Sequence, residues 1–348
     1  MKFSLKNFRK QILHLPIEEV TFARRGFRGG DTRARKRLER VGQTFLLGYH
    51  AALDETDPPA LAQRLNLVDL ELRGFSFEGA AMGLALLDLI TPWNRDRWRS
   101  LFNIAGAHRY MLHVGVGFAL ARVPPWLNTH VALTDSLLRW LVFDGYGFHQ
   151  GYFKWPRYVV KQELPRHLSA YACRAFDQGL GRSLWFVDGA DVNRILETIA
   201  AFSPSRHADL WSGVGLACAY AGGVDTAAIK ALKSAVGPYR RYLAQGAAFA
   251  GKARQQAGNR AEHTDLTCRI LCDLSANAAA SVTDEALKDL HDYEEEPAYE
   301  VWRRRIQEAF EEKFNDRINL FSSPHCELRR PGAHNRGLRI VSCAQLVH

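Results

Sequence analysis

The stretch "RAFDQGLGRSLWFVDG", residues 174–189, sets glycines and charged residues inside an apolar helical pattern. A matching stretch, "RGFSFEGAAMGLALLD", occupies residues 73–88, about 100 residues earlier. In this alignment Gly79 falls on Gly179. The chain therefore presents the same unusual helix pattern twice.

A second pair of segments repeats the correspondence at nearly the same offset. "HRYMLHVGVGFALARV" (108–123) aligns with "HADLWSGVGLACAYAGG" (207–223), so that His108 matches His207. Self-similarity of this kind predicts a duplicated unit of several helices, each copy burying its apolar face on the other.

Glycines at short spacing mark both copies. Glycine inside a helix costs about 1 kcal/mol relative to alanine, so some gain must offset it. Two explanations are open at this point: close approach of two helices, or backbone that lies against a ligand.

Helical periodicity dominates from residue 32 to about residue 314, and alternating β patterns are rare. We predict a mostly α fold, an internally duplicated helical domain of two repeats of about 100 residues with a pocket between the repeats. The predicted parts are a basic N-terminal arm and helix (1–52), a duplicated helical body (53–314, with repeats near 65–130 and 165–230 and closing helices at 231–314) and a poorly ordered tail (315–348). Individual helices are expected over 32–52, from Pro58 onward, and over 294–314.

The net charge is +9, but the positive excess lies in the first 41 residues and in the tail. The body is nearly neutral, which argues against a nucleic-acid partner, because such proteins carry a basic face on their folded part. No run approaches the roughly 18 apolar residues of a membrane-spanning helix. The N-terminal stretch "MKFSLKNFRKQILHLPIEEV" alternates basic and apolar residues, and is either a helix docked on the core or a peripheral membrane contact.

The six cysteines include no CxxC pair, which indicates reduced thiols and a cytoplasmic protein. Cys268 and Cys272 share a helix face, but no second pair completes a zinc site. No metal and no cofactor is expected, and the oligomeric state is left open.

Polar residues beside the glycines are the strongest candidates for a site. Glu78 in one copy, and Asp177 with Gln178 in the other, come directly before a glycine. Charged side chains amid apolar helices are rarely buried unless they are paired, and Arg73 and Arg174 are the expected partners. These groups either hold the duplicated core together or line a cavity between the repeats.

"FDGYGFHQGYF", residues 143–153, lies between the copies and has a composition typical of pocket walls. Aromatic side chains also gather in and beside the repeats, and an elongated apolar ligand would suit a cavity among them. His149 could act as an acid or a base near neutral pH. The expected catalytic residues are Asp177, Glu78 and His149. The expected binding residues are Arg73, Arg174, Gln178, Arg182, Asp144, Tyr146, His108, His207, Trp185 and Trp211.

The motifs of several common chemistries do not fit. "GVG" at 115–117 and 213–215 is not the GxGxxG of dinucleotide sites, and no GxSxG elbow occurs. "DGAD" at 188–191 resembles half of an aspartate-rich diphosphate motif, although Asp191 fits a helix cap better.

Four strings together carry a family resemblance: "RGFSFEGAAM", "DGYGFHQGYF", "RAFDQGLGRSLWFVDG" and "HADLWSGVGLACAYAGG". They resemble a bacterial family of unknown function whose members are described as UnbL-like enediyne biosynthesis proteins. The resemblance covers roughly residues 15–314, and "EVTFARRGF" (19–27) also fits. It implies a role beside iterative polyketide synthases that make linear polyenes, in turning a polyene into an enediyne core. Relatives outside such gene clusters leave another lipid or isoprenoid partner open, and the resemblance supplies no catalytic residue.

We therefore expect a natural-product biosynthesis protein that assists the isomerisation or cyclisation of a polyene or other long apolar chain. Asp177 and Glu78 would be its acid and base, and Arg73, Arg174 and Arg182 would orient them or bind an anionic head group. One alternative is a non-catalytic scaffold or carrier that joins other biosynthetic proteins. A weaker alternative is an isoprenoid or terpene cyclase that uses "DGAD" with magnesium.

Overall fold

The computed structural model describes residues 12–91, 93, 96–124, 135–290 and 296–322, with side chains as far as residue 316. The described residues are mostly helical and contain no strand, which confirms the predicted mostly α fold. Two compact units divide the chain, residues 1–311 and 312–348. The features below belong to the first unit, and the last helix continues into the second.

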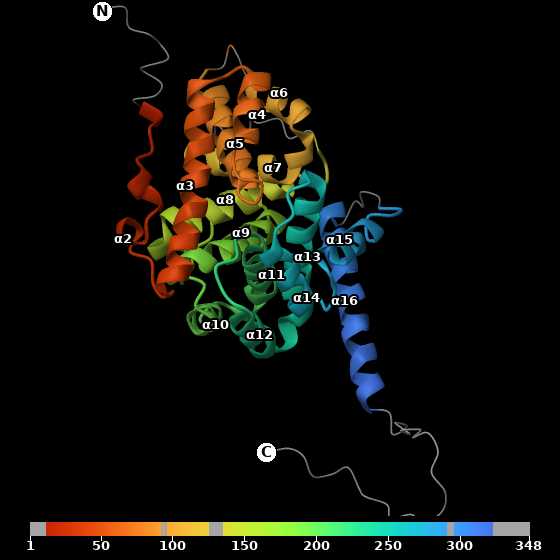
Figure 1. The fold of residues 1–348 in the computed structure, drawn as a ribbon. Coiled ribbons are helices and arrows are strands. Elements are labelled where there is room, and N and C mark those ends of the chain that lie inside the picture. Colours follow the sequence, from red (N-terminus) through yellow and green to blue (C-terminus); the bar gives the residue numbers. More distant parts are fainter. Residues whose placement is uncertain (1–11, 92, 94–95, 125–134, 291–295, 323–348) are drawn as a thin grey trace, which may run out of the picture. The chain divides into compact units, whose positions relative to one another are not determined.

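Long helices form the framework of the first unit (Figure 1). These are α3 (Thr32–Asp54), α5 (Arg73–Ile90), α7 (Arg109–Leu120), α8 (Trp140–Phe153), α9 (Ala170–Val187), α11 (Pro204–Ala221), α13 (Arg240–Ala257) and α16 (Ala298–Ser322). Shorter helices connect or flank them, namely α2 (Phe22–Arg25), α4 (Pro58–Asn66), α6 (Arg97–Ile104), α10 (Val192–Ala200), α12 (Thr226–Ala235), α14 (Glu262–Leu271) and α15 (Ala276–Glu285). Single turns of tighter or wider helix are η1 (Ile17–Val20), η2 (Gly106–His108), η4 (Pro156–Val160) and η5 (Gly237–Tyr239).

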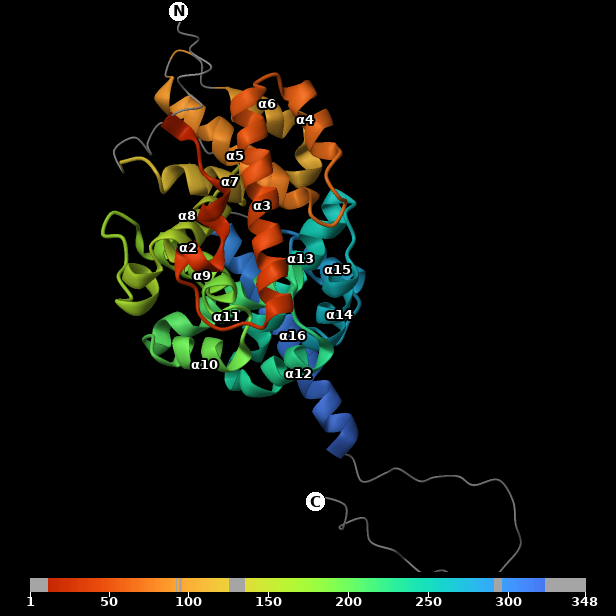
Figure 2. The ribbon, with the colours of Figure 1, turned by 60° about the vertical axis from the view of Figure 1, so that its left-hand side comes forward.

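The framework helices pack in chain order, from α3 through α5, α7, α8, α9 and α11 to α13. This row curls back on itself, because α11 also contacts α3. The Arg37 guanidinium on α3 donates a hydrogen bond of 2.9 Å to the Ala221 carbonyl at the end of α11. Figure 2 brings α3 to the front of the row. Helices that are distant in the sequence therefore share one interior.

Glycine pairs let the helices of this row approach closely. On α9, a Cβ added to Gly179 would overlap the Asp144 carbonyl oxygen of α8, and one added to Gly181 would overlap the Leu210 carbonyl oxygen of α11. The first glycine thus faces the preceding helix and the second faces the following one. The same arrangement recurs at Gly115 and Gly117, Gly145 and Gly147, and Gly213 and Gly215. Close helix–helix approach, one of the two explanations left open by the sequence, is confirmed at these positions.

Several predicted boundaries agree with the structure. The helix expected over 32–52 is α3, and the Asp31 side chain caps it by accepting from the Ala34 amide. Helix α4 begins at Pro58, where a missing N–H costs nothing.

The closing helix differs from its expected span of 294–314. It begins at Ala298 and continues to Ser322, so residues 315–322 are helical rather than part of a tail. The sequence contains neither proline nor glycine between Ala298 and Pro324. No helix-breaking residue therefore interrupts the helix, which explains why it continues. The rest of the predicted tail lies outside the described residues.

The N-terminal arm packs on the body over its described part. Phe22 and Phe27 are buried, and the Trp155 indole donates to the Arg25 carbonyl at 2.9 Å. Gly30 has a φ of +72° and lies directly on the Gly189 backbone, where only glycine fits. The sequence left open whether the N-terminal stretch is a docked helix or a membrane contact. Most of that stretch, residues 1–11, lies outside the described part. Among the described helices none is both long and apolar enough to cross a membrane.

Candidate functional site

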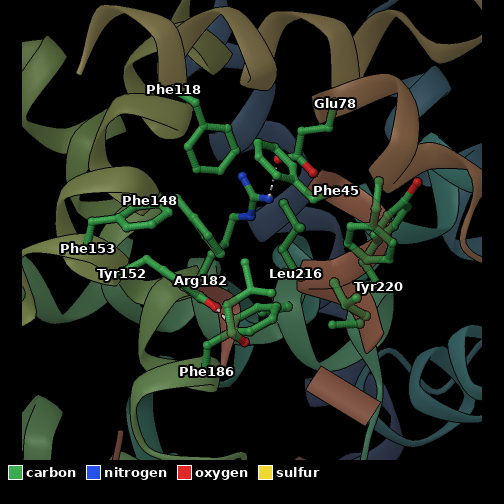
Figure 3. Close-up of a pocket in the computed structure, with 16 residues that line it drawn as sticks. Phe45, Glu78, Phe118, Phe148, Tyr152, Phe153, Arg182, Phe186, Leu216 and Tyr220 are labelled. Atoms are coloured by element: carbon green, nitrogen blue, oxygen red, sulfur yellow. Dashed lines mark hydrogen bonds and ion pairs between the residues drawn. The ribbon is translucent and has the colours of Figure 1, made fainter. Parts of the chain in front are cut away.

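An aromatic cavity lies inside the curl of the helix row (Figure 3). Side chains from the arm and from α3, α5, α7, α8, α9 and α11 enclose it. Its aromatic walls are Phe45, Phe75, Phe118, Phe148, Tyr152, Phe153, Phe186 and Tyr220. The space open to the centre of a water molecule is about 50 Å³, and one ordered water needs roughly 10–15 Å³ of such space. The cavity is therefore small, with room for roughly four water molecules.

One acidic side chain lines this cavity. Glu78 is 3 % exposed, and burial raises its pKa to about 7, although the nearby Arg182 guanidinium opposes the shift. The two groups approach to 3.5 Å between Oε1 and Nη2. Figure 3 shows Arg182 in the middle of the aromatic walls with its guanidinium directed toward Glu78. The cavity thus holds a carboxyl group that changes its protonation state near neutral pH.

Arg182 has a second carboxylate partner, Asp144 on α8, which it contacts through Nη1. Arg182, Asp144 and Glu78 are all buried, so this cluster of one cation and two acids is shielded from water. Because two acids already surround Arg182, it does not offer a free positive charge. The structure therefore does not support the expected role of Arg182 in binding an anionic head group.

A row of buried polar side chains continues from Asp144 across the helices. The Gln178 amide donates to Asp144 Oδ2 at 2.8 Å and to the Tyr299 hydroxyl at 3.2 Å. The Ser212 hydroxyl lies 3.4 Å from Gln178 Oε1 and 2.8 Å from Gln245 Oε1. Four members of this row directly precede the first glycine of their helix, namely Asp144, Gln178, Ser212 and Gln245. Close helix packing and the hydrogen-bonded row therefore come from adjacent positions.

Asp177 does not belong to the cavity, contrary to the prediction. It forms a two-pronged pair with Arg206 of α11, at 2.8 Å and 2.5 Å. Burial raises the pKa of Asp177 to about 6, and the hydrogen bonds from Arg206 oppose this. Asp177 and Gln178 are neighbours on a helix and so point in different directions, which explains why only Gln178 reaches the Asp144 cluster.

The expected arginine partners are also different. Arg174 pairs with Asp209 and Glu300, at 3.1 Å and 2.8 Å, rather than with Asp177. Arg73 donates to the Val68 carbonyl at 3.3 Å, near the start of α5. Arg73 and Glu78 are five residues apart on α5, which is not a neighbouring helical spacing, and both oxygens of Asp177 are already bound by Arg206. The predicted pairs of Arg73 and Arg174 are therefore wrong.

The histidines lie outside the lining of the cavity. His108 stacks on Phe77 with ring centres 4.0 Å apart, and burial lowers its pKa to about 4. His207 Nε2 lies 2.8 Å from the Phe202 carbonyl oxygen. His149 is buried behind the cavity wall, 4.6 Å from the Phe153 ring, and its ring nitrogens have no hydrogen-bond partner within the described residues. Burial lowers the pKa of His149 well below its usual value, so the ring is neutral.

The other candidates have structural contacts. Tyr146 packs between the His167 and Phe176 rings. Trp185 is fully buried, and its indole donates to the Gly222 carbonyl at 2.9 Å. Trp211 is buried on α11 and is not among the side chains that line the cavity.

The "DGAD" aspartates are occupied as well. Asp188 pairs with Arg28 at 2.6 Å and accepts from Thr198. Asp191 caps α10 by accepting from the Asn193 and Arg194 amides, which confirms its expected capping role. These contacts give no support to a diphosphate site. Within the described residues no three His, Cys, Asp or Glu side chains gather in a way that could hold a metal ion.

The sequence interpretation missed the wall that comes from the start of the chain. Val20 of the arm, with Val41 and Phe45 of α3, lines the cavity opposite the repeated segments. The helical spacing of these residues identified an amphipathic helix but not what its apolar face would cover. It also missed Arg206 as the partner of Asp177, because that contact depends on how α9 and α11 cross.

The comparisons with known proteins place the chain in one family. Neither the curated proteins nor the solved structures include a significant match. A family profile matches residues 4–310, nearly the whole of the first compact unit. The chain belongs to the family described as protein of unknown function (DUF1702).

Proposed function

We propose that this protein binds an unsaturated apolar chain in the aromatic cavity and catalyses its proton-driven isomerisation or cyclisation. The observation that carries the proposal is Glu78: one carboxyl group, with its pKa raised to about 7, lining a cavity whose other walls are mostly aromatic. A carboxylic acid that keeps its proton near neutral pH can serve as a general acid.

The proposed reaction begins with proton donation from Glu78 to a carbon of a double bond. The O–H bond breaks, a C–H bond forms, and the positive charge moves onto the chain. A conjugated polyene is the most readily protonated chain of this kind, because its cation is delocalised. Loss of a proton from a neighbouring carbon back to the Glu78 carboxylate would complete an isomerisation, and attack of a second double bond before that loss would close a ring.

The cavity walls suit such a charged intermediate. Aromatic faces attract cations, and the effect is larger where water is excluded. Phe148 already lies against a cation, since the Arg182 guanidinium carbon is 5.0 Å from its ring centre. Arg182 would act as a positioning residue that stabilises the Glu78 carboxylate once the proton has left, while Asp144 holds Arg182 in place.

An internal repeat of the helix row is part of the same proposal. The glycine pairs recur at intervals of about 34 residues, one pair on each of α7, α8, α9 and α11. We infer that the repeated unit is one long helix with its connection, and that three such units produce the offset of about 100 residues seen in the sequence. The cavity would then lie between repeated helices, with α3 and the arm closing it.

The family resemblance suggests a linear polyene as the chain, and the mostly aromatic walls of the cavity are compatible with its apolar character. A carrier that holds such a chain without changing it is the main rival. The two functions differ in one measurable respect, because only the enzyme exchanges hydrogen between the chain and solvent.

The test uses methyl parinarate, a neutral linear conjugated tetraene. The purified full-length protein is incubated with it in deuterium oxide, and the recovered chain is analysed by mass spectrometry and absorbance. We expect catalytic deuterium incorporation by the wild type, at least 100-fold less with Glu78→Gln, and near wild-type incorporation with Asp177→Asn. Saturable binding with no incorporation by the wild type would overturn the enzyme in favour of the carrier.

A further inference from the structure

A second cavity lies beside the aromatic one. It is enclosed by α7, α8, α9, α11, α13 and α16 and offers about 40 Å³ to the centres of water molecules. Its lining is again mostly apolar and includes Met111, Leu141, Phe249 and Trp302. Lys252 and Ala253 at its edge are partly exposed, so this side of the cavity approaches the surface.

The two cavities share a partition made of Arg182, Leu216 and Tyr220, which line both of them. Glu78 lines only the first and Asp144 only the second. The charged cluster therefore stands between two apolar spaces rather than at the closed end of one.

Leu216 is the least firmly packed part of this partition. It lies in the middle of α11 yet is only partly buried, whereas the residues next to it on both sides are buried. The surface it leaves uncovered borders the cavities. A leucine held loosely on two sides can change rotamer at little cost, unlike one fixed in a dense core.

Each cavity by itself accommodates only part of a long chain, since the space open to the centres of water molecules is about 50 Å³ in the first and about 40 Å³ in the second. We propose that the two cavities form one binding site for a long neutral apolar chain, with the Leu216 side chain turned aside and the middle of the chain beside Glu78. This inference rests on the proposed function for the first cavity. It further specifies that the substrate is long, that the middle of its chain is uncharged, and that the reacting double bond is internal.

The test measures binding rather than turnover. Methyl parinarate fluorescence reports occupancy, and saturated methyl esters of increasing chain length compete with it. Each further carbon that reaches an apolar site should improve affinity by roughly fourfold until the site is full. In Ala253→Phe a phenyl ring fills the second cavity, so we expect affinity to stop improving at a shorter chain length. In the wild type we expect affinity to keep improving with longer esters.

Two further variants make the result decisive. Gln256→Phe places the same side chain on an exposed position of α13 and should leave the length profile unchanged. Leu216→Ala removes the leucine side chain from the partition. Relative to the wild type, this variant should bind long esters more tightly than short ones. The same length limit in Ala253→Phe and the wild type would overturn the two-cavity site while leaving the proposed function in place. Failure of the wild type to bind any ester would remove both.

Discussion

Asp177 and Glu78 look alike in the sequence, since each is an acid just before a glycine of a repeated helix, but their surroundings differ. Asp177 receives two hydrogen bonds from Arg206, at 2.8 Å and 2.5 Å. Glu78 has an arginine no closer than 3.5 Å and faces an aromatic cavity. Burial raises both pKa values, to about 6 and about 7 respectively.

The difference teaches that a shifted pKa alone does not identify a working acid. Arg206 matches both oxygens of Asp177 and also donates to the Gln162 carbonyl, so this pair fixes the loop before α9 to α11. Within the described residues the only ion-pair partner of Glu78 is Arg182, which it shares with Asp144, and the aromatic cavity lies beside it. Asp177 is paired with Arg206, whereas Glu78 lines open space, and for this reason we propose Glu78 as the acid that meets a ligand.

The largest effect is expected from Gly179→Ala. The added methyl group would overlap the Asp144 carbonyl oxygen and push α8 from α9, separating Gln178 and Arg182 from Asp144. We expect a loss of about 3–5 kcal/mol in the free energy of unfolding, measured in urea. Gly106→Ala is the control and should be nearly neutral, because its Cβ position is open. An equal loss in both variants would contradict the close-packing account.

Asp177→Ala should come next. It leaves Arg206 mostly buried without its partner, and we expect a loss of about 3 kcal/mol in unfolding free energy. Binding of methyl parinarate to the folded variant should be unchanged, because Asp177 is remote from the cavity lining. Weaker binding of methyl parinarate by the folded variant would contradict the distinction between Asp177 as a structural residue and Glu78 as a cavity residue.

Glu78→Gln should change the pH dependence of stability. The Glu78 carboxyl has a pKa of about 7 when folded, whereas its ordinary pKa of 4.5 applies when the chain is unfolded. Its contribution to stability is therefore complete below pH 4.5 and is lost as the pH rises to 7. The variant lacks this loss, so its stability relative to the wild type should rise by about 3 kcal/mol across that range. A variant that is less stable than the wild type at pH 8 would mean that Glu78 is a paired, ionised support like Asp177.

The smallest effect is expected from Tyr299→Phe. It removes the hydroxyl that accepts from Gln178, but the Gln178 amide keeps its bond to Asp144. We expect a loss of about 1 kcal/mol and an unchanged Glu78 titration, followed by NMR of labelled glutamate carboxyl groups. A displaced titration would show that the hydrogen-bonded row controls the reactive acid as well as supporting the fold.

Local signals in the sequence predicted much of the fold. The helix start at Thr32, the cap at Asp191 and the helix start at Pro58 depend on residues close in the chain, and all three agree with the structure. The glycine pattern allowed close helix contact as one of two explanations, and the structure shows that contact.

The site was less predictable because its contacts join distant helices. Glu78, Asp144 and Arg182 were named as candidates, but their grouping depends on the crossing of α5, α8 and α9. Arg174 was chosen as a partner by proximity in sequence, whereas the side chain it reaches, Asp209, lies on α11. Helix periodicity assigns a face to a residue but does not say which helix covers that face.

The docked N-terminal arm has a consequence for how the protein is made. Each framework helix can pack on the one synthesised before it, so most of the row needs only contacts between chain neighbours. Val20, however, closes a cavity whose far wall includes Tyr220, and the Tyr152 hydroxyl approaches the Val20 carbonyl. The arm must therefore wait for some 200 further residues to be synthesised before its position is complete. A chain in which the arm has not yet docked would expose an aromatic-lined groove and would be prone to aggregation. Docking of the arm is therefore the folding step that covers this groove.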